Sequence, residues 1–175
     1  MKMDAMGNRW MVVAALGAAG ALGLLIAGGA MLRAEPKKAA KTFDALADPA
    51  LEAMKKRAAE LKIGGVAVVA YFDGDSVQAW NSKMVVVGRM KDAPSTGNNG
   101  ANLLGIAYTK ASEMAETLKD SGSGVRPPMI GEYGWQGGVI AKAKHGYAIA
   151  AFSGGKSEDD VEVSKAGVGV LKNVE

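Results

Sequence analysis

The stretch from Gly137 to Asp160, GGVIAKAKHGYAIAAFSGGKSEDD, constrains the fold more than any other part of the sequence. Two runs rich in apolar residues, Val139–Lys144 and Tyr147–Ser153, flank the dipeptide His145-Gly146. A two-residue loop containing glycine between such runs is typical of a β-hairpin. The sequence therefore predicts two adjacent antiparallel strands here.

Pairing Lys144 with Tyr147 across this hairpin determines which side chains share a face. One face then carries small apolar side chains, which suits a helix packed closely against it. The other face mixes lysines with Ile140, Ile149 and Tyr147, so we expect it to be partly exposed to water. The small apolar face consists of three cross-strand pairs: Ala143 with Ala148, Ala141 with Ala150, and Val139 with Phe152.

A last helix is predicted directly after the hairpin. Gly154-Gly155 turns the chain, and Ser157-x-x-Asp160 has the form of a capping box that opens a helix. One side of that helix carries Val161, Val168 and Leu171.

Upstream of the hairpin the sequence predicts a helix followed by two strands. Asp48-Pro49 is typical of an N-cap and a first helical position, and Gly64-Gly65 ends the helix. Val66–Phe72 is apolar on both faces, which predicts a central strand, and Lys83–Met90 is its expected antiparallel partner. The apolar stripe of the helix consists of Leu51, Met54, Ala58 and Leu61.

The middle of the chain combines loops with a second helix. Lys91–Gly100 has the composition of a loop, and Ala101–Lys119 returns to helical spacing. Ser121–Pro128 is a flexible break, and Met129–Gln136 allows one further short strand. The order helix, strand, strand, helix, optional strand, strand, strand, helix predicts an α+β fold with helices packed on an antiparallel sheet.

The first 34 residues form a separate segment, in which Trp10–Leu32 carries no charged residue after a short basic start. A cleaved signal peptide and a retained membrane anchor both fit this segment. Its apolar run exceeds the usual signal core of about 7–15 residues and meets the roughly 20 that a membrane span needs. We expect an anchor or leader over residues 1–34, a linker over 35–47, and a domain over 48–175 that lies outside the cytoplasm.

Composition and spacing exclude several kinds of site. The chain has no cysteine, which excludes disulfides, zinc–thiolate sites and iron–sulfur ligation. The net charge of the chain is +3, but from Glu35 onward 18 basic and 17 acidic residues are interleaved, unlike the basic patch of a nucleic-acid-binding domain. No Ser-His-Asp set, metal triad or close carboxylate pair can be assembled from the spacing, so an enzyme is the minority interpretation.

Four groups of motifs occur in the order of a known family. They are Val66–Phe72, Arg89–Ala93 (RMKDA), Ala107-x-x-Lys110-Ala111 with Ala115, and Gly137-Gly138 followed by His145-Gly146, Ser153-Gly154-Gly155 and Asp160. From about Leu51 to Leu171 the chain thereby resembles the GlcG/HbpS-like haem-binding domain family. The resemblance implies a profilin-like fold, a tendency to form homo-oligomers and, in some members, binding of haem or another tetrapyrrole outside the cytoplasm. Asp75–Lys83 and Tyr133–Trp135 depart from the family's pattern.

The ligand-binding candidates are Arg89, Lys110, Asp160, Gly154 and Gly155. Arg89 and Lys110 match motif positions of the family, and both could neutralise a propionate or another carboxylate in a cleft between sheet and helix. The alternative is an internal ion pair or a capping contact with Asp92 or Asp160. Gly154-Gly155 before a helix can receive an anion, but the acidic run Glu158–Asp160 favours a plain turn.

His145 is the only histidine, and histidine is a common axial haem ligand. Its place in the hairpin loop favours a turn residue with a positive φ instead. The methionines Met54, Met84 and Met114 fall on core-facing positions, which favours packing over metal ligation. Three aromatic residues flank variable loops, as lids of the core or as anchors of a protein contact: Trp80, Tyr133 and Trp135.

Three functions follow from these observations. The first is a non-enzymatic ligand-binding domain outside the cytoplasm, tethered to a membrane, with haem or another tetrapyrrole as the ligand that the resemblance implies. The second is an accessory subunit that docks on a larger membrane complex. The third is an enzyme acting on haem or a small organic acid.

Overall fold

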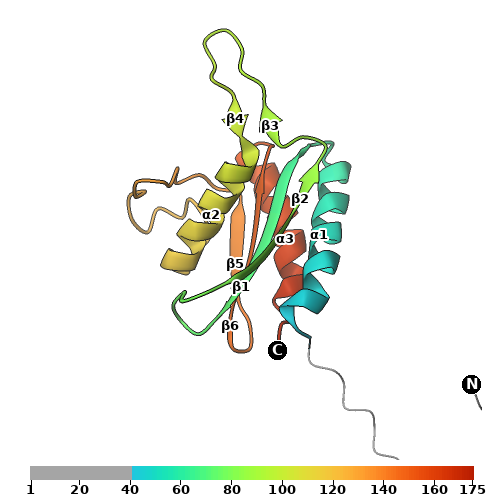
Figure 1. The fold of residues 1–175 in the computed structure, drawn as a ribbon, viewed down its shortest axis with the longest axis vertical. Coiled ribbons are helices and arrows are strands. Elements are labelled where there is room, and N and C mark those ends of the chain that lie inside the picture. Colours follow the sequence, from blue (N-terminus) through green and yellow to red (C-terminus); the bar gives the residue numbers. More distant parts are fainter. Residues whose placement is uncertain (1–40) are drawn as a thin grey trace, which may run out of the picture. The chain divides into compact units, whose positions relative to one another are not determined.

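The computed structural model describes residues 41–175 of the chain, drawn as a ribbon in Figure 1. The predicted α+β class is confirmed, with helices flanking a four-stranded antiparallel sheet. The elements are α1 (Phe43–Glu60), β1 (Gly65–Asp73), β2 (Asn81–Val87), β3 (Lys91–Asp92), β4 (Ala101–Asn102), α2 (Leu103–Thr117), β5 (Gly138–Lys142), β6 (Gly146–Ser153) and α3 (Ser157–Leu171).

The sheet has the strand order β2-β1-β6-β5, and every neighbouring pair is antiparallel. β1 lies between β2 and β6, and all of its residues except the last are buried. The predictions of a central strand at Val66–Phe72 and of an antiparallel partner after it are therefore confirmed. A strand that is apolar on both faces needs cover on both, which explains why helices pack on each side.

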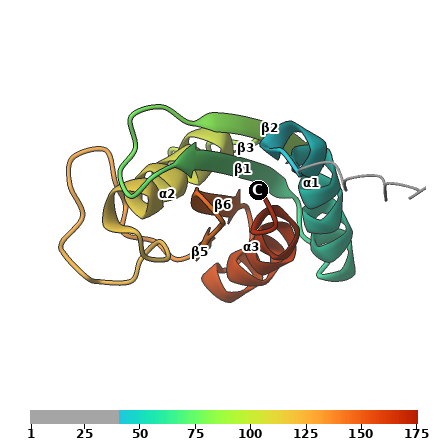
Figure 2. The same ribbon diagram turned by 90° about the horizontal axis from the view of Figure 1, so that it is seen from below.

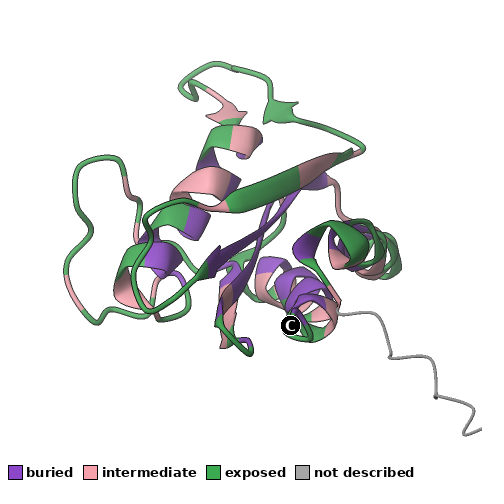
Figure 3. Ribbon diagram, turned by 60° about the horizontal axis from the view of Figure 1, so that its bottom comes forward, coloured by how far each residue is buried: buried purple, intermediate pink, exposed green. Residues whose placement is uncertain are grey.

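Helices cover both faces of the sheet and give three layers, as seen from below in Figure 2. α1 and α3 pack on the face that carries Val69 and Phe152, whereas α2 packs on the face that carries Phe72 and Ile149. Figure 3 shows the buried positions concentrated in β1, β6 and the helix sides that face them. The second hairpin face is partly exposed to water, as predicted: Lys142 is exposed and Ile140 is half-buried, whereas α2 buries Ile149 completely.

The first helix begins at Phe43, so the prediction that Asp48-Pro49 starts it is wrong. Thr42 is the N-cap, and its hydroxyl accepts a hydrogen bond from the amide of Ala45 at 3.3 Å. Pro49 lies inside the helix, where it removes one backbone donor. Phe43 is buried in the core, and this tertiary contact extends the helix beyond the start that the local signal indicates.

The hairpin is confirmed as two adjacent antiparallel strands, but its predicted register is wrong by two residues. Lys142 pairs with Tyr147, in place of Lys144. The turn is closed by a hydrogen bond of 2.8 Å from the amide of Ala143 to the carbonyl of Gly146. Because side chains alternate with a period of two, this shift leaves every side chain on its predicted face.

Pairing of β6 with β1 explains why the turn is longer than the predicted two residues. Gly146 lies so close to β1 that a Cβ atom there would be 1.8 Å from the carbonyl oxygen of Phe72, so this glycine serves the strand and not the loop. His145 lies in the turn, as predicted. The expected positive φ is wrong, because Lys62 and Leu118 are the only non-glycine residues with a positive φ in the described range.

Three further predictions are corrected. The predicted loop 91–100 includes part of a short antiparallel ribbon, in which Lys91 of β3 pairs with Asn102 of β4, and this ribbon projects as an arm in Figure 1. The optional strand at Met129–Gln136 does not form. The N-cap of α3 is Lys156 and no side chain caps the helix, so the Ser157 capping box is wrong.

The expected anchor or leader over residues 1–34 lies outside the described residues, as does the linker through residue 40. Within residues 41–175, no helix is long and apolar enough to cross a membrane. The sites described below all lie within residues 41–175.

Candidate functional site

A polar cleft of about 200 Å³ lies where the end of β6 meets the start of α3 and the first half of α2. Four of the five predicted ligand-binding residues line this cleft, and the fifth, Arg89, contacts its wall at Gly154. The fold thus brings together residues that lie far apart in the sequence. The residues that line the polar cleft include Lys110, Gly154, Gly155 and Asp160, with Asp92, Trp135, Gln136, Ser153 and Ser157.

A buried ion pair joins α2 to α3 at the base of the polar cleft. Lys110 Nζ donates to Asp160 Oδ2 at 2.9 Å and to the carbonyl oxygen of Phe152 at 2.8 Å. The two charged side chains are only 4% and 5% exposed. An ammonium group has three donors, so one N–H of Lys110 has no protein acceptor among the described residues.

Burial affects both members of the pair. It lowers the pKa of the Lys110 ammonium, against the opposing effect of the Asp160 charge. It raises the pKa of the Asp160 carboxyl, against the charge of Lys110 and the amide of Gly155, which donates to Oδ1 at 2.8 Å. Asp160 therefore caps a backbone amide, as expected, but that amide precedes the helix.

Gly137 lies directly against the buried ion pair of Lys110 and Asp160. Its φ of +130° suits glycine, and a Cβ atom there would lie 2.2 Å from Lys110 Nζ. The carbonyl of Gly137 accepts a hydrogen bond of 2.7 Å from the buried hydroxyl of Ser164 on α3. The chain therefore requires glycine here so that the lysine can reach Asp160.

Arg89 joins the start of β1 to the end of β6. Its Nη1 donates to the carbonyl of Gly64 and its Nη2 to the carbonyl of Gly154, each at 2.6 Å. Its Nε donates to Asp92 Oδ1 at 2.7 Å. The alternative of internal ion pairs is what the structure shows for both cations, since Arg89 pairs with Asp92 and Lys110 with Asp160.

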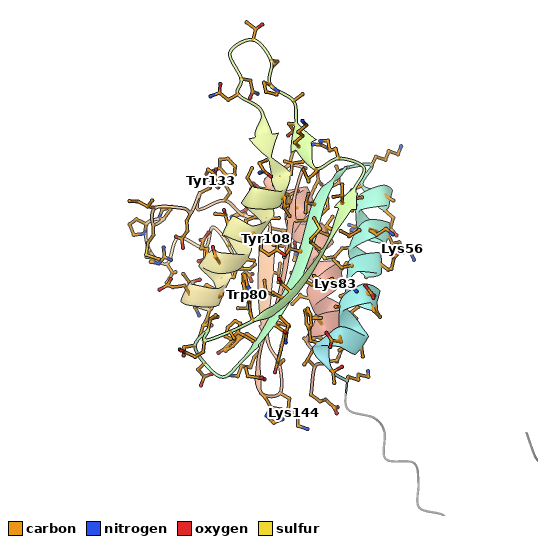
Figure 4. All side chains as sticks on the ribbon, in the orientation of Figure 1. Lys56, Trp80, Lys83, Tyr108, Tyr133 and Lys144 are labelled. Atoms are coloured by element: carbon orange, nitrogen blue, oxygen red, sulfur yellow. The ribbon has the colours of Figure 1, made fainter. Side chains whose placement is uncertain are left out.

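Two exposed aromatic residues stand beside the polar cleft. The Tyr133 and Trp135 rings stack with centroids 4.5 Å apart and planes inclined by 21°. The two residues are 52% and 50% exposed, and Trp135 lines the cleft. Figure 4 places Tyr133 on the loop outside α2. They therefore form a flat apolar surface at the cleft. They do not cover the core, so the prediction that they act as lids of the core is wrong.

Arg126 holds the loop that carries this aromatic stack. It donates to Glu132 at 2.7 and 2.9 Å and to Glu116 of α2 at 2.6 and 2.9 Å. Hydrogen bonds from Arg126 and from the amide of Met129 lower the pKa of Glu132 to about 2. Sequence patterns gave no indication of this bracing, because it depends on residues that meet only in the folded loop.

Glu113 is a buried carboxylate on α2 that the sequence did not single out. Its Oε1 accepts a hydrogen bond of 2.9 Å from the amide of Gly122, which holds the start of the same loop against the helix. Its Oε2 has no hydrogen-bond partner among the described residues. A glutamate on a helix is ordinarily exposed, so no sequence signal distinguishes this one.

His145 and the polar cleft lie at opposite ends of β6. The strand has eight residues, which at about 3.3 Å per residue separates its ends by roughly 25 Å. His145 therefore does not reach a ligand in the cleft. Among residues 41–175, no group of three or more histidine, aspartate or glutamate side chains is placed to hold a metal ion.

No protein-family model matches the chain, and no curated protein matches it. The resemblance to the GlcG/HbpS-like family therefore rests on the sequence motifs and stays a prediction.

Proposed function

We propose that this domain is a non-enzymatic ligand-binding domain of the GlcG/HbpS-like type, held outside the cytoplasm at a membrane by its N-terminal segment. The ligand carries a carboxylate on a flat apolar body, and a tetrapyrrole such as haem is the ligand that the resemblance implies. The observation that carries this proposal is the position of an exposed aromatic stack beside a cleft that contains a buried amine.

The carboxylate end of the ligand fits the polar cleft. Lys110 has one N–H that no described protein group accepts, and Ser157 adds a hydroxyl at the uncapped start of α3. Asp160 Oδ2 accepts from Lys110 and Oδ1 from the amide of Gly155, so donors occupy both oxygens of this carboxylate and the charge of Lys110 offsets its repulsion of a ligand carboxylate. A volume of about 200 Å³ lies below the usual range of about 300–1,000 Å³ for ligand sites, so the cleft takes a propionate arm and not a whole ring.

The flat body of the ligand fits the aromatic stack of Tyr133 and Trp135. Half of each residue is exposed, and offset stacking of a further aromatic ring on such a surface is favourable. No histidine lies near enough to coordinate iron, because His145 is at the far end of β6. Binding would therefore depend on the ring face and the propionates, and the metal would contribute little.

Titration of the purified protein with haemin, followed by visible absorption, tests this proposal. We expect a Soret shift at micromolar protein, comparable binding of metal-free protoporphyrin IX, and loss of at least about tenfold in affinity for the dimethyl ester, since a charge-assisted hydrogen bond is lost. Trp135→Ala should weaken binding by about tenfold through lost stacking. Ile130→Ala, at an exposed position of the same loop, is the matched control.

The results distinguish whether haem binds at all from whether it binds at the polar cleft. No Soret shift with haemin would remove haem as a ligand. Equal affinity of the wild type and Trp135→Ala would leave haem binding intact but move it away from the polar cleft.

A second function, an accessory subunit of a larger membrane complex, is favoured by the same loop. Val125 is 59% exposed, Met129 49% and Ile130 fully exposed, and Arg126 ties this apolar loop to Glu116 and Glu132 through two ion pairs. A preformed apolar surface of this kind is typical of protein contacts. Ile130→Asp should abolish co-purification of the protein with the larger complex from detergent-solubilised membranes if the domain docks through the loop, whereas release of the wild type with a mature N-terminus near residue 31 or 35 would exclude a tether.

A further inference from the structure

A second and larger cavity lies between the β1–β2 connection and the second half of α2. Its volume is about 630 Å³, within the range of small-molecule sites. It is lined by residues 75–80 of the connection and by Ser112, Ala115 and Glu116 of α2. We call it the Trp80 cavity, and Figure 4 shows Trp80 at this place, below Tyr108 of α2.

Most of the surface that lines the Trp80 cavity is apolar, and it contains one large aromatic side chain. Trp80 is half-buried against the core cluster that contains Ala115, and it forms a tilted pair with Tyr108, with ring centroids 6.4 Å apart. Val77, Ala79 and Ala115 add small apolar groups around it. An indole flanked by small side chains suits an aromatic ring better than a branched aliphatic ligand.

The two charged residues that line this cavity are both acidic. Asp75 is held by Lys142, and Glu116 by Arg126, and neither of these cations lines the cavity. The ion pairs use Asp75 Oδ1 and Glu116 Oε2, which leaves Asp75 Oδ2 and Glu116 Oε1 without a hydrogen-bond donor among the described residues. The two side chains are 80% and 54% exposed, so these oxygens can accept from a ligand at little desolvation cost.

We propose that the Trp80 cavity binds an aromatic amine. The ring of the ligand lies against Trp80, and its ammonium group donates to the free oxygens of Asp75 or Glu116. An aromatic acid of the same shape is repelled by these carboxylates, so the charge preference is opposite to that of the polar cleft. This site goes beyond the ligand-binding function proposed above and shares no lining residue with the polar cleft, although Glu116 also pairs with Arg126 of the loop that carries the aromatic stack.

Two naphthalene probes of opposite charge test the proposal. The full chain is titrated calorimetrically at neutral pH with 1-naphthylmethylamine, a cation, and with 1-naphthoate, an anion. We expect the amine to bind at least about tenfold more tightly, because a charge-assisted hydrogen bond replaces a like-charge contact. Glu116→Gln should reduce this preference several-fold.

Substitutions in and outside the Trp80 cavity test whether the amine binds there. Ser112→Trp fills the cavity from an exposed position of α2 and should abolish binding of the amine, and Trp80→Ala should weaken it by about tenfold. Trp135→Ala, at the polar cleft, is the matched control and should leave the affinity for the amine unchanged. If Trp80→Ala does not fold, Ser112→Trp still decides the result.

Several results would overturn the proposal. They are equal affinity for the two probes, no binding of the amine to the wild type, or unchanged binding in Ser112→Trp. Failure of haemin to bind in the earlier titration would leave this inference standing, because the two sites share no residue.

Discussion

The polar cleft and the Trp80 cavity both border α2, yet they treat charge in opposite ways. At the cleft, Lys110 and Asp160 are almost completely buried and use most of their hydrogen-bonding capacity on the protein itself. At the cavity, Asp75 and Glu116 are largely exposed and each uses only one carboxylate oxygen. The comparison teaches that charges at the cleft serve the fold first, whereas those at the cavity are available to a ligand at little cost in stability.

Desolvation explains this difference. Moving a charge out of water is costly, and a partner offsets that cost only with good geometry and further hydrogen bonds. Lys110 and Asp160 meet this condition through Phe152 and Gly155. Exposed pairs neither incur the cost nor gain much from the contact, because water screens them.

Breaking the buried pair should have the largest effect. Lys110→Met leaves the Asp160 carboxylate buried without its cation, and we expect the free energy of unfolding to fall by about 3–5 kcal/mol. Equilibrium unfolding in urea, followed by circular dichroism, measures this loss. The same substitution at the exposed cation that pairs with Asp75, Lys142→Met, is the matched control and should change stability very little.

The double variant Lys110→Met/Asp160→Leu removes both buried charges. It should recover most of the stability that Lys110→Met loses, because apolar residues can replace a buried pair at little cost. A Lys110→Met protein as stable as the wild type would contradict the interpretation that the buried charges at the cleft stabilise the fold.

Two glycines with positive φ extend the comparison to the backbone. Gly137→Ala strains a φ of +130° and also forces a Cβ atom to within 2.2 Å of Lys110 Nζ, so we expect a loss of about 3 kcal/mol. Gly74→Ala, in the β1–β2 connection, strains a φ of +80° in open space and should cost about 1 kcal/mol. Thermal unfolding of the two variants measures the difference, and equal losses would show that the ion pair gives way without cost.

The architecture could be predicted because each major element has a local signal. Val66–Phe72 is apolar on both faces and occupies the centre of the sheet, and the hairpin runs are adjacent strands. The register could not be predicted, because Gly146 approaches the carbonyl of Phe72, which is remote in sequence. The start of α1 likewise depends on burial of Phe43.

The candidate sites divide in the same way. Motif positions indicated Lys110 and Asp160, and the possibility that they pair with each other was among the alternatives, although the two residues lie fifty positions apart. The aromatic stack could not be assembled from sequence, because Tyr133 and Trp135 are positioned by Arg126 and its two carboxylates. The Trp80 cavity also escapes local patterns, since it needs α2 to pack beside a loop.

The smallest expected effect concerns Tyr71, which lies near the end of β1 that leads into the Trp80 cavity. Its hydroxyl donates to Asp73 Oδ1 at 2.7 Å, and burial, with that hydrogen bond and the Asp73 charge, raises its pKa from 10 to about 12. Because the folded-state pKa is raised, the contribution to stability is complete below about pH 10 and is lost as the pH rises through 12.

Tyr71→Phe cannot ionise, so its free energy of unfolding should fall less between pH 10 and pH 12 than that of the wild type. Urea unfolding across this range measures both slopes, with Tyr133→Phe as the exposed control. Parallel profiles for the wild type and Tyr71→Phe would mean that ionisation of the Tyr71 hydroxyl does not change the free energy of unfolding.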